Sequence, residues 1–288
     1  IIIPQQFIDV NLFRIIMKIV SFNTNGIRAR PHQLKQLKVD YAPDIIGIQE
    51  SKVQDSEFPE QMICDLDFEP HYFGQKGHYG VAMLTTATPE SVERGFPGDE
   101  EDAQRRMIIG NFRLQDGALL KVMNGYFPQG ENRDHPIKFP AKQKFYEDLM
   151  DYLNNYCTPD MHLVVMGDFN IAPEDTDIGI GEKNAKRWLK EGTTSFLPEE
   201  RDWYQKLMAW GLFDSYRHLY PDSMEKFSWF NYRTRAFEQE EKKGLRIDQI
   251  LCSKSLLATI KASDIAYDIR SMEKPSDHCP IWTEFDIS

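Results

Sequence analysis

The stretch LVVMGDFN, residues 163–170, begins as an apolar, β-branched run and ends on polar side chains. Such a run predicts a buried β-strand over 163–166, and the polar residues mark its end. The same pattern closes three further predicted strands, within VSFNTNG (20–26), IIGIQE (45–50) and NGY (124–126). Because loops at strand ends form the ligand sites of α/β sheets, these polar residues predict a functional site.

The rest of the chain alternates between strand-like and helix-like patterns. Apolar residues recur at helical spacing over 145–156 and again over 203–210, where Gly211 predicts the end of a helix. Pro31 predicts the start of another helix. Because strands alternate with helices in some regions and follow one another in others, we expect an α/β protein with mixed sheets. The predicted strands are 19–22, 44–48, 79–84, 107–112, 119–126, 163–166, 246–252 and 280–285.

The domain organisation is predicted to be simple. The chain has no internal repeat, low-complexity segment or Pro/Gly/Ser-rich linker, which predicts one domain over residues 17–288. Residues 1–16 lack the unbroken apolar core of a signal peptide. We interpret them as an upstream extension or a segment added by cloning; the alternative is an arm that packs on the fold.

Composition excludes several classes of protein. The 288 residues are 41% hydrophobic and 12% aromatic, which is typical of a globular chain and argues against disorder. No apolar run approaches the ~18 residues of a transmembrane helix, so no membrane partner is expected. The four cysteines form no C-x-x-C pair, which predicts free thiols in a reducing cytoplasm. The histidines do not have the spacing of a zinc site.

The formal net charge of −11 argues, taken alone, against a nucleic-acid partner. The basic residues are clustered, however, as in Arg105-Arg106 and in the predicted helix that carries Lys186 and Arg187. The ordinary interpretation of each cluster is a solvated face. A local basic surface, with the acidic residues on the far side, would allow DNA to bind. An acidic surface is also typical of a salty or cold habitat.

The polar residues at the strand ends are those that metal-assisted chemistry uses. Carboxylate and amide oxygens suit a hard cation such as Mg²⁺ or Mn²⁺, and a histidine beside an aspartate can donate to a phosphate oxygen. The set therefore predicts metal-assisted hydrolysis of a phosphoester. Each residue alone has a simpler interpretation: turn residues for the asparagines, a helix cap for Glu50, the core for Tyr126, an ion pair for Asp248 and a structural role for His278. The prediction rests on six strand ends that carry such residues together: the four named above, and the segments 246–248 and 276–278, each of which precedes a predicted strand.

Three short motifs resemble the signature of the endonuclease/exonuclease/phosphatase superfamily: Gln49-Glu50, Gly167-Asp168-Phe169-Asn170 and Ser276-Asp277-His278. Longer segments resemble the bacterial exonuclease III family, namely 124–146, 179–189, 196–203, 227–232 and 270–278. The similarity extends from residue 17 to about residue 285.

This resemblance implies a four-layer α/β sandwich, with two packed mixed sheets and helices outside. It implies an endonuclease that cuts 5′ to abasic sites. Activities as a 3′-to-5′ exonuclease on duplex DNA, a 3′-phosphatase and a 3′-phosphodiesterase would accompany it, and RNase H-like activity is a further candidate. The implied cofactor is Mg²⁺, with Mn²⁺ as a substitute. The implied partner is double-stranded DNA with abasic sites or 3′ ends, bound by a monomer.

The resemblance also assigns roles to individual residues. Glu50 would hold the metal, with Asn23, Asn25 and Asp277 nearby as direct or water-mediated ligands. Asp168 would activate the water or bind the metal, and Asn170 would position the nucleophile, the phosphate or the metal. Tyr126 would act beside the scissile phosphate as an acid or a transition-state stabiliser. His278 would contact a phosphate oxygen, with Asp248 orienting its imidazole. Whether Asp168 or Tyr126 activates the water stays open.

Further residues are assigned to DNA binding. Trp229, Phe230 and Leu245 would wall a pocket for a flipped abasic sugar; the alternative is that the aromatic pair belongs to the core. Gln129 would approach the gap in the duplex. Phosphate contacts are expected from Arg105, Arg106, Lys186 and Arg187.

Two competing functions share part of this pattern. A phosphatase or phosphodiesterase of the same superfamily that acts on a small molecule or a lipid would carry the metal motifs, but not the Trp229-Phe230 segment or the basic helix. A non-catalytic DNA-binding module would have no need of the intact polar set.

Overall fold

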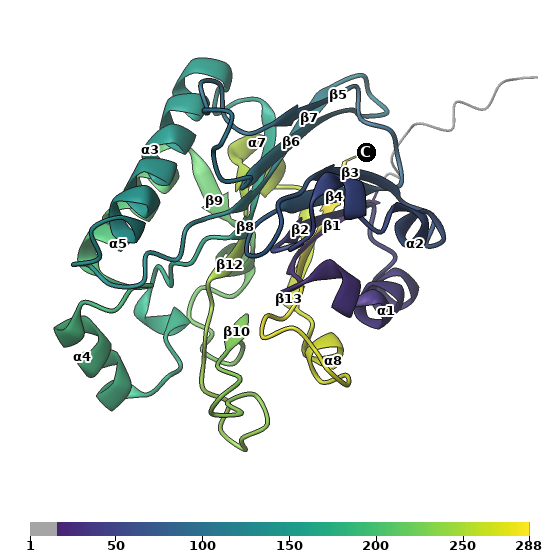
Figure 1. The fold of residues 1–288 in the computed structure, drawn as a ribbon. Coiled ribbons are helices and arrows are strands. Elements are labelled where there is room, and N and C mark those ends of the chain that lie inside the picture. Colours follow the sequence, from purple (N-terminus) through teal and green to yellow (C-terminus); the bar gives the residue numbers. More distant parts are fainter. Residues whose placement is uncertain (1–15, 288) are drawn as a thin grey trace, which may run out of the picture.

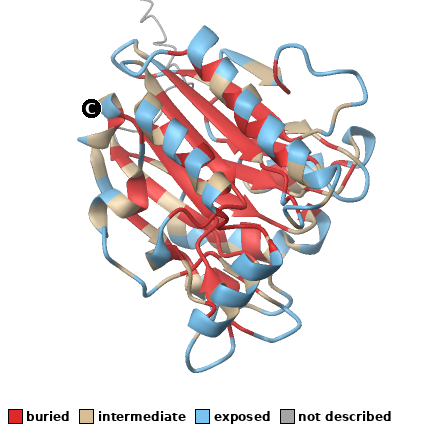
Figure 2. Cartoon of the chain, turned by 90° about the vertical axis from the view of Figure 1, so that its left-hand side faces the viewer, coloured by how far each residue is buried: buried red, intermediate tan, exposed pale blue. Residues whose placement is uncertain are grey.

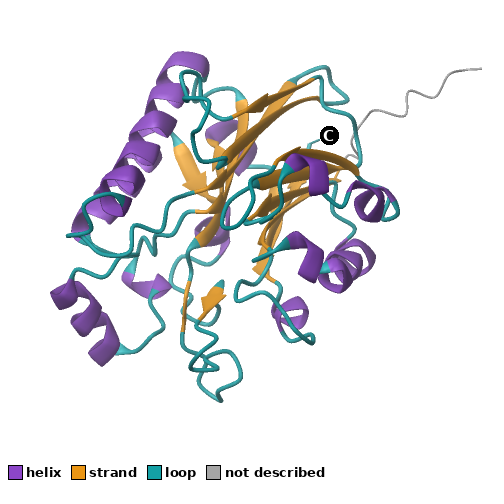
Figure 3. Ribbon diagram, viewed as in Figure 1, coloured by secondary structure: helices purple, strands orange, loops and turns teal. Residues whose placement is uncertain are grey.

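The computed structural model describes residues 16–287, and within that range the strands form two six-stranded sheets and one two-stranded ribbon. The two large sheets pack face to face, with helices on both outer sides (Figures 1 and 3). This arrangement confirms the predicted four-layer α/β sandwich. The predicted extension lies outside the described residues, except that the first strand begins at Ile16.

The first sheet has, in order, β13 (Ile260–Ile265), β14 (Ile281–Asp286), β1 (Ile16–Asn23), β2 (Ile45–Gln49), β4 (Val81–Thr85) and β3 (Glu69–Phe73). The second has β5 (Ser91–Arg94), β6 (Met107–Arg113), β7 (Leu119–Tyr126), β8 (His162–Asp168), β12 (Asp248–Ser253) and β9 (Leu212–Asp214). The ribbon pairs β10 (Trp229–Phe230) with β11 (Gly244–Leu245). In each large sheet of the described chain one pair is parallel, β1 with β2 and β7 with β8, so both sheets are mixed, as predicted.

The helices cover the outer faces of the sheets. On the first sheet lie α1 (Pro31–Tyr41), α2 (Glu60–Cys64) and α8 (Tyr267–Arg270), which share an apolar cluster with β1 and β2. On the second lie α3 (Lys138–Tyr156) and α5 (Pro198–Trp210), which pack on β7 and β8. The remaining helices are α4 (Glu182–Glu191), α6 (Ser215–Leu219) and α7 (Lys254–Leu257). Figure 2 shows buried strands between helices whose outer faces are exposed.

A polar bridge joins the two sheets inside this apolar core. The Asn124 side chain of β7 donates to the carbonyl oxygens of Ile48 and Ala82, at 3.0 Å each, in the first sheet. Gln49 donates in turn to Asn124 Oδ1 at 2.6 Å and to Ser21 Oγ at 3.0 Å. Because a buried amide is costly when unpaired, these bonds favour one relative position of the sheets.

Gly167 brings β7 and β8 close together just before Asp168. Its φ of +146° is rare for residues with a side chain, and a Cβ atom there would lie 1.9 Å from the carbonyl oxygen of Gly125. Only glycine therefore allows β8 to reach its last residue in this register. Within residues 16–287, no helix is both long and apolar enough to span a bilayer.

Candidate active site

The predicted site residues gather at one edge of the sandwich, where strands of both sheets begin or end. The first sheet contributes Asn23 at the end of β1, Glu50 directly after β2, and the segment 276–278 before β14. The second contributes Tyr126 at the end of β7, Asp168 at the end of β8, Asn170 two residues later and Asp248 at the start of β12. The site is therefore shared between the two sheets.

Two carboxylates and an amide form its centre. Asn23 Nδ2 donates to Glu50 Oε1 at 3.0 Å and to Asp168 Oδ2 at 2.9 Å. One potential ligand atom each from Glu50, Asp168 and His278 lies within 4.8 Å of the other two. The Asn170 backbone N–H donates to Asp168 Oδ1 at 3.0 Å, and this turn places Asn170 in the left-handed region, at φ +53°. Both oxygens of Asp168 are thus held.

A histidine–aspartate pair lies against this centre. His278 Nδ1 is 2.8 Å from Asp248 Oδ2, and His278 Nε2 is 3.8 Å from Asp168 Oδ2. Burial alone would lower the pKa of His278, but Asp248 and Asp168 outweigh it and raise the pKa to about 10. The imidazole is therefore a cation at neutral pH. Burial raises the pKa of Asp168 to about 7. The charge of His278 opposes this increase, and the neighbouring carboxylates Asp248 and Glu50 add to it.

Tyr126 lies beside the same carboxylates and is backed by Arg106. Burial, with the charges of Glu50 and Asp168, raises the pKa of Tyr126 well above its ordinary value, so the phenol keeps its proton. The Arg106 guanidinium stacks 4.7 Å from the Tyr126 ring centroid and 4.5 Å from that of Tyr79. Arg106 Nη1 also donates to the Tyr126 carbonyl oxygen at 3.0 Å. Arg106 is 8% exposed and is held against the ring and main chain of Tyr126, so it supports Tyr126 from behind.

The oxygen-rich centre fits a hard divalent cation. Glu50 and Asp168 supply carboxylate oxygens, the ligands that Mg²⁺ and Mn²⁺ prefer. The Lys52 ammonium is a cation bound at this centre: its Nζ lies 2.9 Å from Glu50 Oε2 and also donates to Asn25 Oδ1. Asn23 presents its N–H side to the carboxylates, since its Oδ1 accepts the Asn25 backbone N–H at 3.0 Å. A direct metal bond from Asn23 would need a flipped amide.

Asp277 is held at the side of the site by two hydrogen bonds. Its Oδ1 accepts Asn25 Nδ2 at 2.8 Å, and its Oδ2 accepts Trp229 Nε1 at 3.1 Å. These bonds connect the metal-side loop to the ribbon of β10 and β11. Trp229 is half-buried, whereas Phe230 and Leu245 are completely buried. Phe230 packs on Phe237 with ring centroids 5.0 Å apart, whereas Leu245 pairs with Trp229 across the ribbon and packs with it in a separate apolar cluster.

The other predicted DNA-binding residues lie on the surface in different settings. Gln129 is exposed and donates to Thr194 Oγ1 at 2.9 Å. Lys186 and Arg187 are exposed on α4, where Lys186 pairs with Glu182 at 2.5 Å. Arg105 is half-buried and pairs with Asp55 at 2.6 Å.

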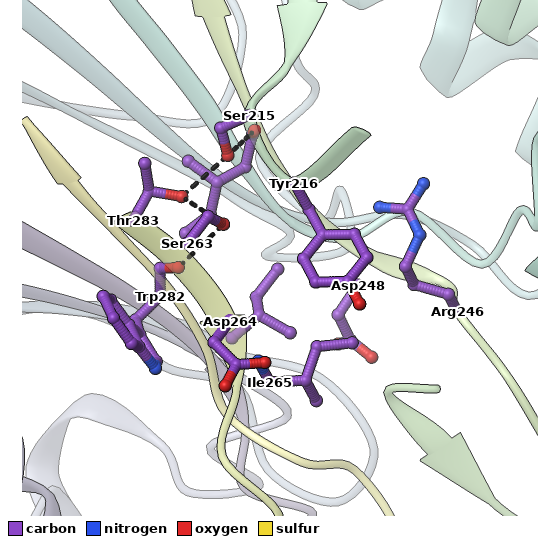
Figure 4. A pocket seen from close by; sticks show the side chains of 11 residues that line it. Ser215, Tyr216, Arg246, Asp248, Ser263, Asp264, Ile265, Trp282 and Thr283 are labelled. Atoms are coloured by element: carbon purple, nitrogen blue, oxygen red, sulfur yellow. Dashed lines mark hydrogen bonds between the residues drawn. The ribbon is translucent and has the colours of Figure 1, made fainter. Parts of the chain in front are cut away.

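A small cavity lies behind Asp248, between the two sheets (Figure 4). It holds about 10 Å³ and is lined by three hydroxyls joined in a chain, with Ser215 Oγ 2.7 Å and Ser263 Oγ 3.1 Å from Thr283 Oγ1. That volume is about the minimum for one water molecule. This cavity is therefore too small to hold a substrate.

Two residues of the site were not predicted from the sequence. Ser228 Oγ accepts the backbone N–H groups of Ile247 and Asp248, at 3.0 and 2.9 Å, and so fixes the start of β12. Lys52 was not predicted either, although its position two residues after Glu50 was a usable signal. Ser228 offered none, because its contacts join residues 19 and 20 positions apart.

Comparisons with known proteins agree with this geometry. The model of the Endonuclease/Exonuclease/phosphatase family matches residues 20–278. The exodeoxyribonuclease III of Haemophilus influenzae is 54% identical over 269 residues, which cover 93% of this chain and all of that protein. A Neisseria 3′ phosphatase, solved with a product DNA hairpin, is 33% identical, with a TM-score of 0.83 and coverage of 93% of this chain and 99% of that one.

An AP endonuclease from Archaeoglobus fulgidus is 30% identical, with a TM-score of 0.84 and coverage of 94% of this chain and 99% of that one. All three relatives span nearly the full length of the described domain. The family match itself covers most of the chain and every residue of the centre. The protein therefore belongs to the endonuclease/exonuclease/phosphatase family, and it is a hydrolytic enzyme of that family.

Proposed function

We propose that this protein is a Mg²⁺-dependent DNA repair nuclease. It cuts duplex DNA 5′ to abasic sites, removes nucleotides from 3′ ends, and removes 3′-phosphate and related blocking groups. The observation that carries the proposal is the closeness of Glu50, Asp168 and His278: one side-chain oxygen or nitrogen of each lies within 4.8 Å of the other two, which places two carboxylates for a metal beside a cationic donor for a phosphate. The activities named for the three relatives, an exodeoxyribonuclease, a 3′ phosphatase and an AP endonuclease, all break phosphoester bonds.

Glu50 and Asp168 would hold the metal ion. When bound, Mg²⁺ would neutralise charge on the scissile phosphate and orient it for in-line attack, and Mn²⁺ would serve as a substitute. Lys52 would compete with the ion for the Glu50 carboxylate, since its ammonium lies 2.9 Å from Glu50 Oε2. Asn23 keeps Glu50 and Asp168 at a fixed separation through its two hydrogen bonds.

The remaining residues move protons and stabilise charge. Asp168 takes the proton from the attacking water, and Asn170 positions that water and the phosphate. Tyr126 keeps its proton at neutral pH, so it donates a hydrogen bond to the phosphate and does not act as the base. His278, charged by its pairing with Asp248, donates to a phosphate oxygen as negative charge develops there.

DNA lies across the same edge. Trp229 stands next to the centre through its bond to Asp277, and residue 178, before α4, pairs with Leu245 of the ribbon. This places Lys186 and Arg187 on the helix that follows, where they contact phosphates without reading sequence. Gln129 contacts the duplex from the loop after Tyr126. The protein acts as a monomer, and its four free cysteines are consistent with a reducing cytoplasm.

The experiment that tests this proposal uses a labelled duplex with one tetrahydrofuran abasic analogue. Incision immediately 5′ to the analogue is expected with Mg²⁺ and none in EDTA. Asp168→Asn should reduce the incision rate by at least ~10²-fold, since it removes both the general base and a carboxylate that would hold the metal. The matched control is Asp160→Asn on an exposed turn, which should leave the rate unchanged.

Two other outcomes would redirect the assignment. If the folded protein with Mg²⁺ cuts no DNA but releases phosphate from an inositol phosphate, it is a small-molecule phosphatase of the same family. If Asp168→Asn cuts as fast as wild type, Asp168 is not the base.

A further inference from the structure

A buried ion pair lies beneath the catalytic turn, on the helix side of the second sheet. Lys142 in α3 and Glu200 in α5 are both completely buried, and Lys142 Nζ is 2.5 Å from Glu200 Oε1. Replacing such a pair by apolar residues is often neutral or stabilising, because both charges must be desolvated. Its contribution to stability is therefore a weak reason for a charged pair in this place, and its contacts indicate a different role.

The Lys142 ammonium binds three separate segments. It donates to the carbonyl oxygen of Asn170 at 2.8 Å and to that of Gln129 at 3.3 Å, as well as to Glu200. An ammonium has three N–H groups, so all of its donors are used. Glu200 Oε2 accepts the backbone N–H groups of Ser195 and Leu197, at 3.0 and 2.8 Å, which anchors the pair to the loop before α5.

The segment held in this way is the turn that carries the site. Asn170 has a left-handed backbone, at φ +53°, and its N–H donates to Asp168 Oδ1. A non-glycine residue keeps this conformation only where its surroundings enforce it. One turn further along α3, Tyr146 donates to the carbonyl oxygen of Phe169 at 2.8 Å. Two successive carbonyls of the catalytic turn are thus bound from behind by the same helix.

From this arrangement we infer that Lys142 and Tyr146 are positioning residues, which set the geometry of Asp168 and Asn170 by holding the main chain of residues 169–170. The inference rests on the proposed nuclease function. Both side chains are buried, and their donors are bound to protein oxygens, so they act through the turn. Lys142 also connects the catalytic turn to the Gln129 loop, so the same ammonium fixes the distance between the centre and a segment that faces DNA.

The test compares variants that release the turn with matched controls on the same helix. Lys142→Met alone would leave Glu200 buried and unpaired, so it is combined with Glu200→Gln. Tyr146→Phe removes one hydroxyl and keeps the packing of the ring. The controls are Lys144→Met and Tyr156→Phe, whose side chains are exposed on α3. Lys142→Arg, which keeps the charge and the donors, tests for rescue.

Two measurements decide the outcome. The first is steady-state incision of the abasic duplex. We expect the double variant to lose about 10²-fold in kcat with KM changed less than ~3-fold, because misplaced groups slow the chemical step and leave binding intact. Tyr146→Phe should lose about fivefold in kcat, the equivalent of one hydrogen bond. Lys142→Arg should recover most of the loss, and the controls should match wild type.

The second measurement is the amide resonance of Asn170 in ¹H–¹⁵N spectra. The double variant and Tyr146→Phe should shift it, because its hydrogen bond to Asp168 Oδ1 changes, whereas the controls should not. The inference is overturned if folded variants keep both the wild-type kcat and the wild-type resonance. If the double variant does not fold, Tyr146→Phe decides by the same criteria. If wild type and controls fail to cut DNA, the proposed function is wrong, and the resonance still tests the positioning role.

Discussion

Arg246 provides the most direct test of how the start of β12 is held in place. It lies two residues before Asp248 and is 2% exposed. Its Nε donates to Asp177 Oδ1 at 2.6 Å and its Nη2 to Asp214 Oδ2 at 2.7 Å. Arg246→Met keeps much of the volume and removes the charge. Removing one partner of a buried pair costs about 3–5 kcal/mol, because the other charge stays buried and uncompensated.

The lower end of that range is expected, because Asp177 keeps its second partner, Arg217. At about 3 kcal/mol, and about 2–4 °C per kcal/mol for a domain of this size, Tm should fall by about 6–12 °C. Urea unfolding followed by tryptophan fluorescence at pH 7.5 measures the free energy. The matched control is Arg201→Met, whose partner Asp175 is 93% exposed, so a loss of only ~0–1 kcal/mol is expected.

The pH dependence has a defined sign. Burial alone would raise the pKa of Asp177, but Arg246 and Arg217 outweigh it and lower the pKa below its ordinary value. The stabilisation is therefore present above the unfolded pKa of about 4 and is lost as pH falls through the folded value. The gap between wild type and Arg246→Met should narrow below about pH 4. A loss no larger than that of Arg201→Met at pH 7.5 would refute the reasoning.

Three further predictions concern single residues near the centre. Gly167→Ala should destabilise the fold by more than ~2 kcal/mol, measured by thermal unfolding, because its Cβ would meet the Gly125 carbonyl oxygen at 1.9 Å; an unchanged Tm would contradict this. Glu50→Gln should weaken Mg²⁺ binding by more than ~10-fold in calorimetry, since it removes a charged ligand, and equal affinity would exclude Glu50 as a ligand. Asp248→Asn should lower the pKa of His278, which NMR titration of the metal-free protein measures, and the wild-type imidazole should stay protonated to about pH 10.

The central strands could be predicted from the sequence, whereas the edge strands could not. All eight predicted strands exist. The four strands of the described sheets that were not predicted, β3, β5, β9 and β13, are the edges of the two sheets. An edge strand bonds to one neighbour only and is partly exposed, so its sequence lacks a continuous apolar run. In β3 and β5 no residue is fully buried.

The site was predictable to the extent that its residues stand at strand ends. Glu50, Asp168 and Asp248 are brought together because both sheets place those ends at one edge. The supporting contacts were not predictable, since they join residues that are distant in sequence: 58 positions separate Lys142 from Glu200. The burial of Arg106 behind Tyr126 was not predictable either. Nothing in the Arg105-Arg106 pair indicates which of the two arginines is buried.

The division of the site between two sheets has a consequence for protein synthesis. Asn23 lies near one end of the described chain and His278 near the other, and β1 completes its sheet only by pairing with β14. While residues 278–286 are still inside the ribosome, the nascent chain therefore lacks both His278 and β14, the strand that follows it. Hydrolytic activity can therefore arise only after the chain has emerged and folded through β14.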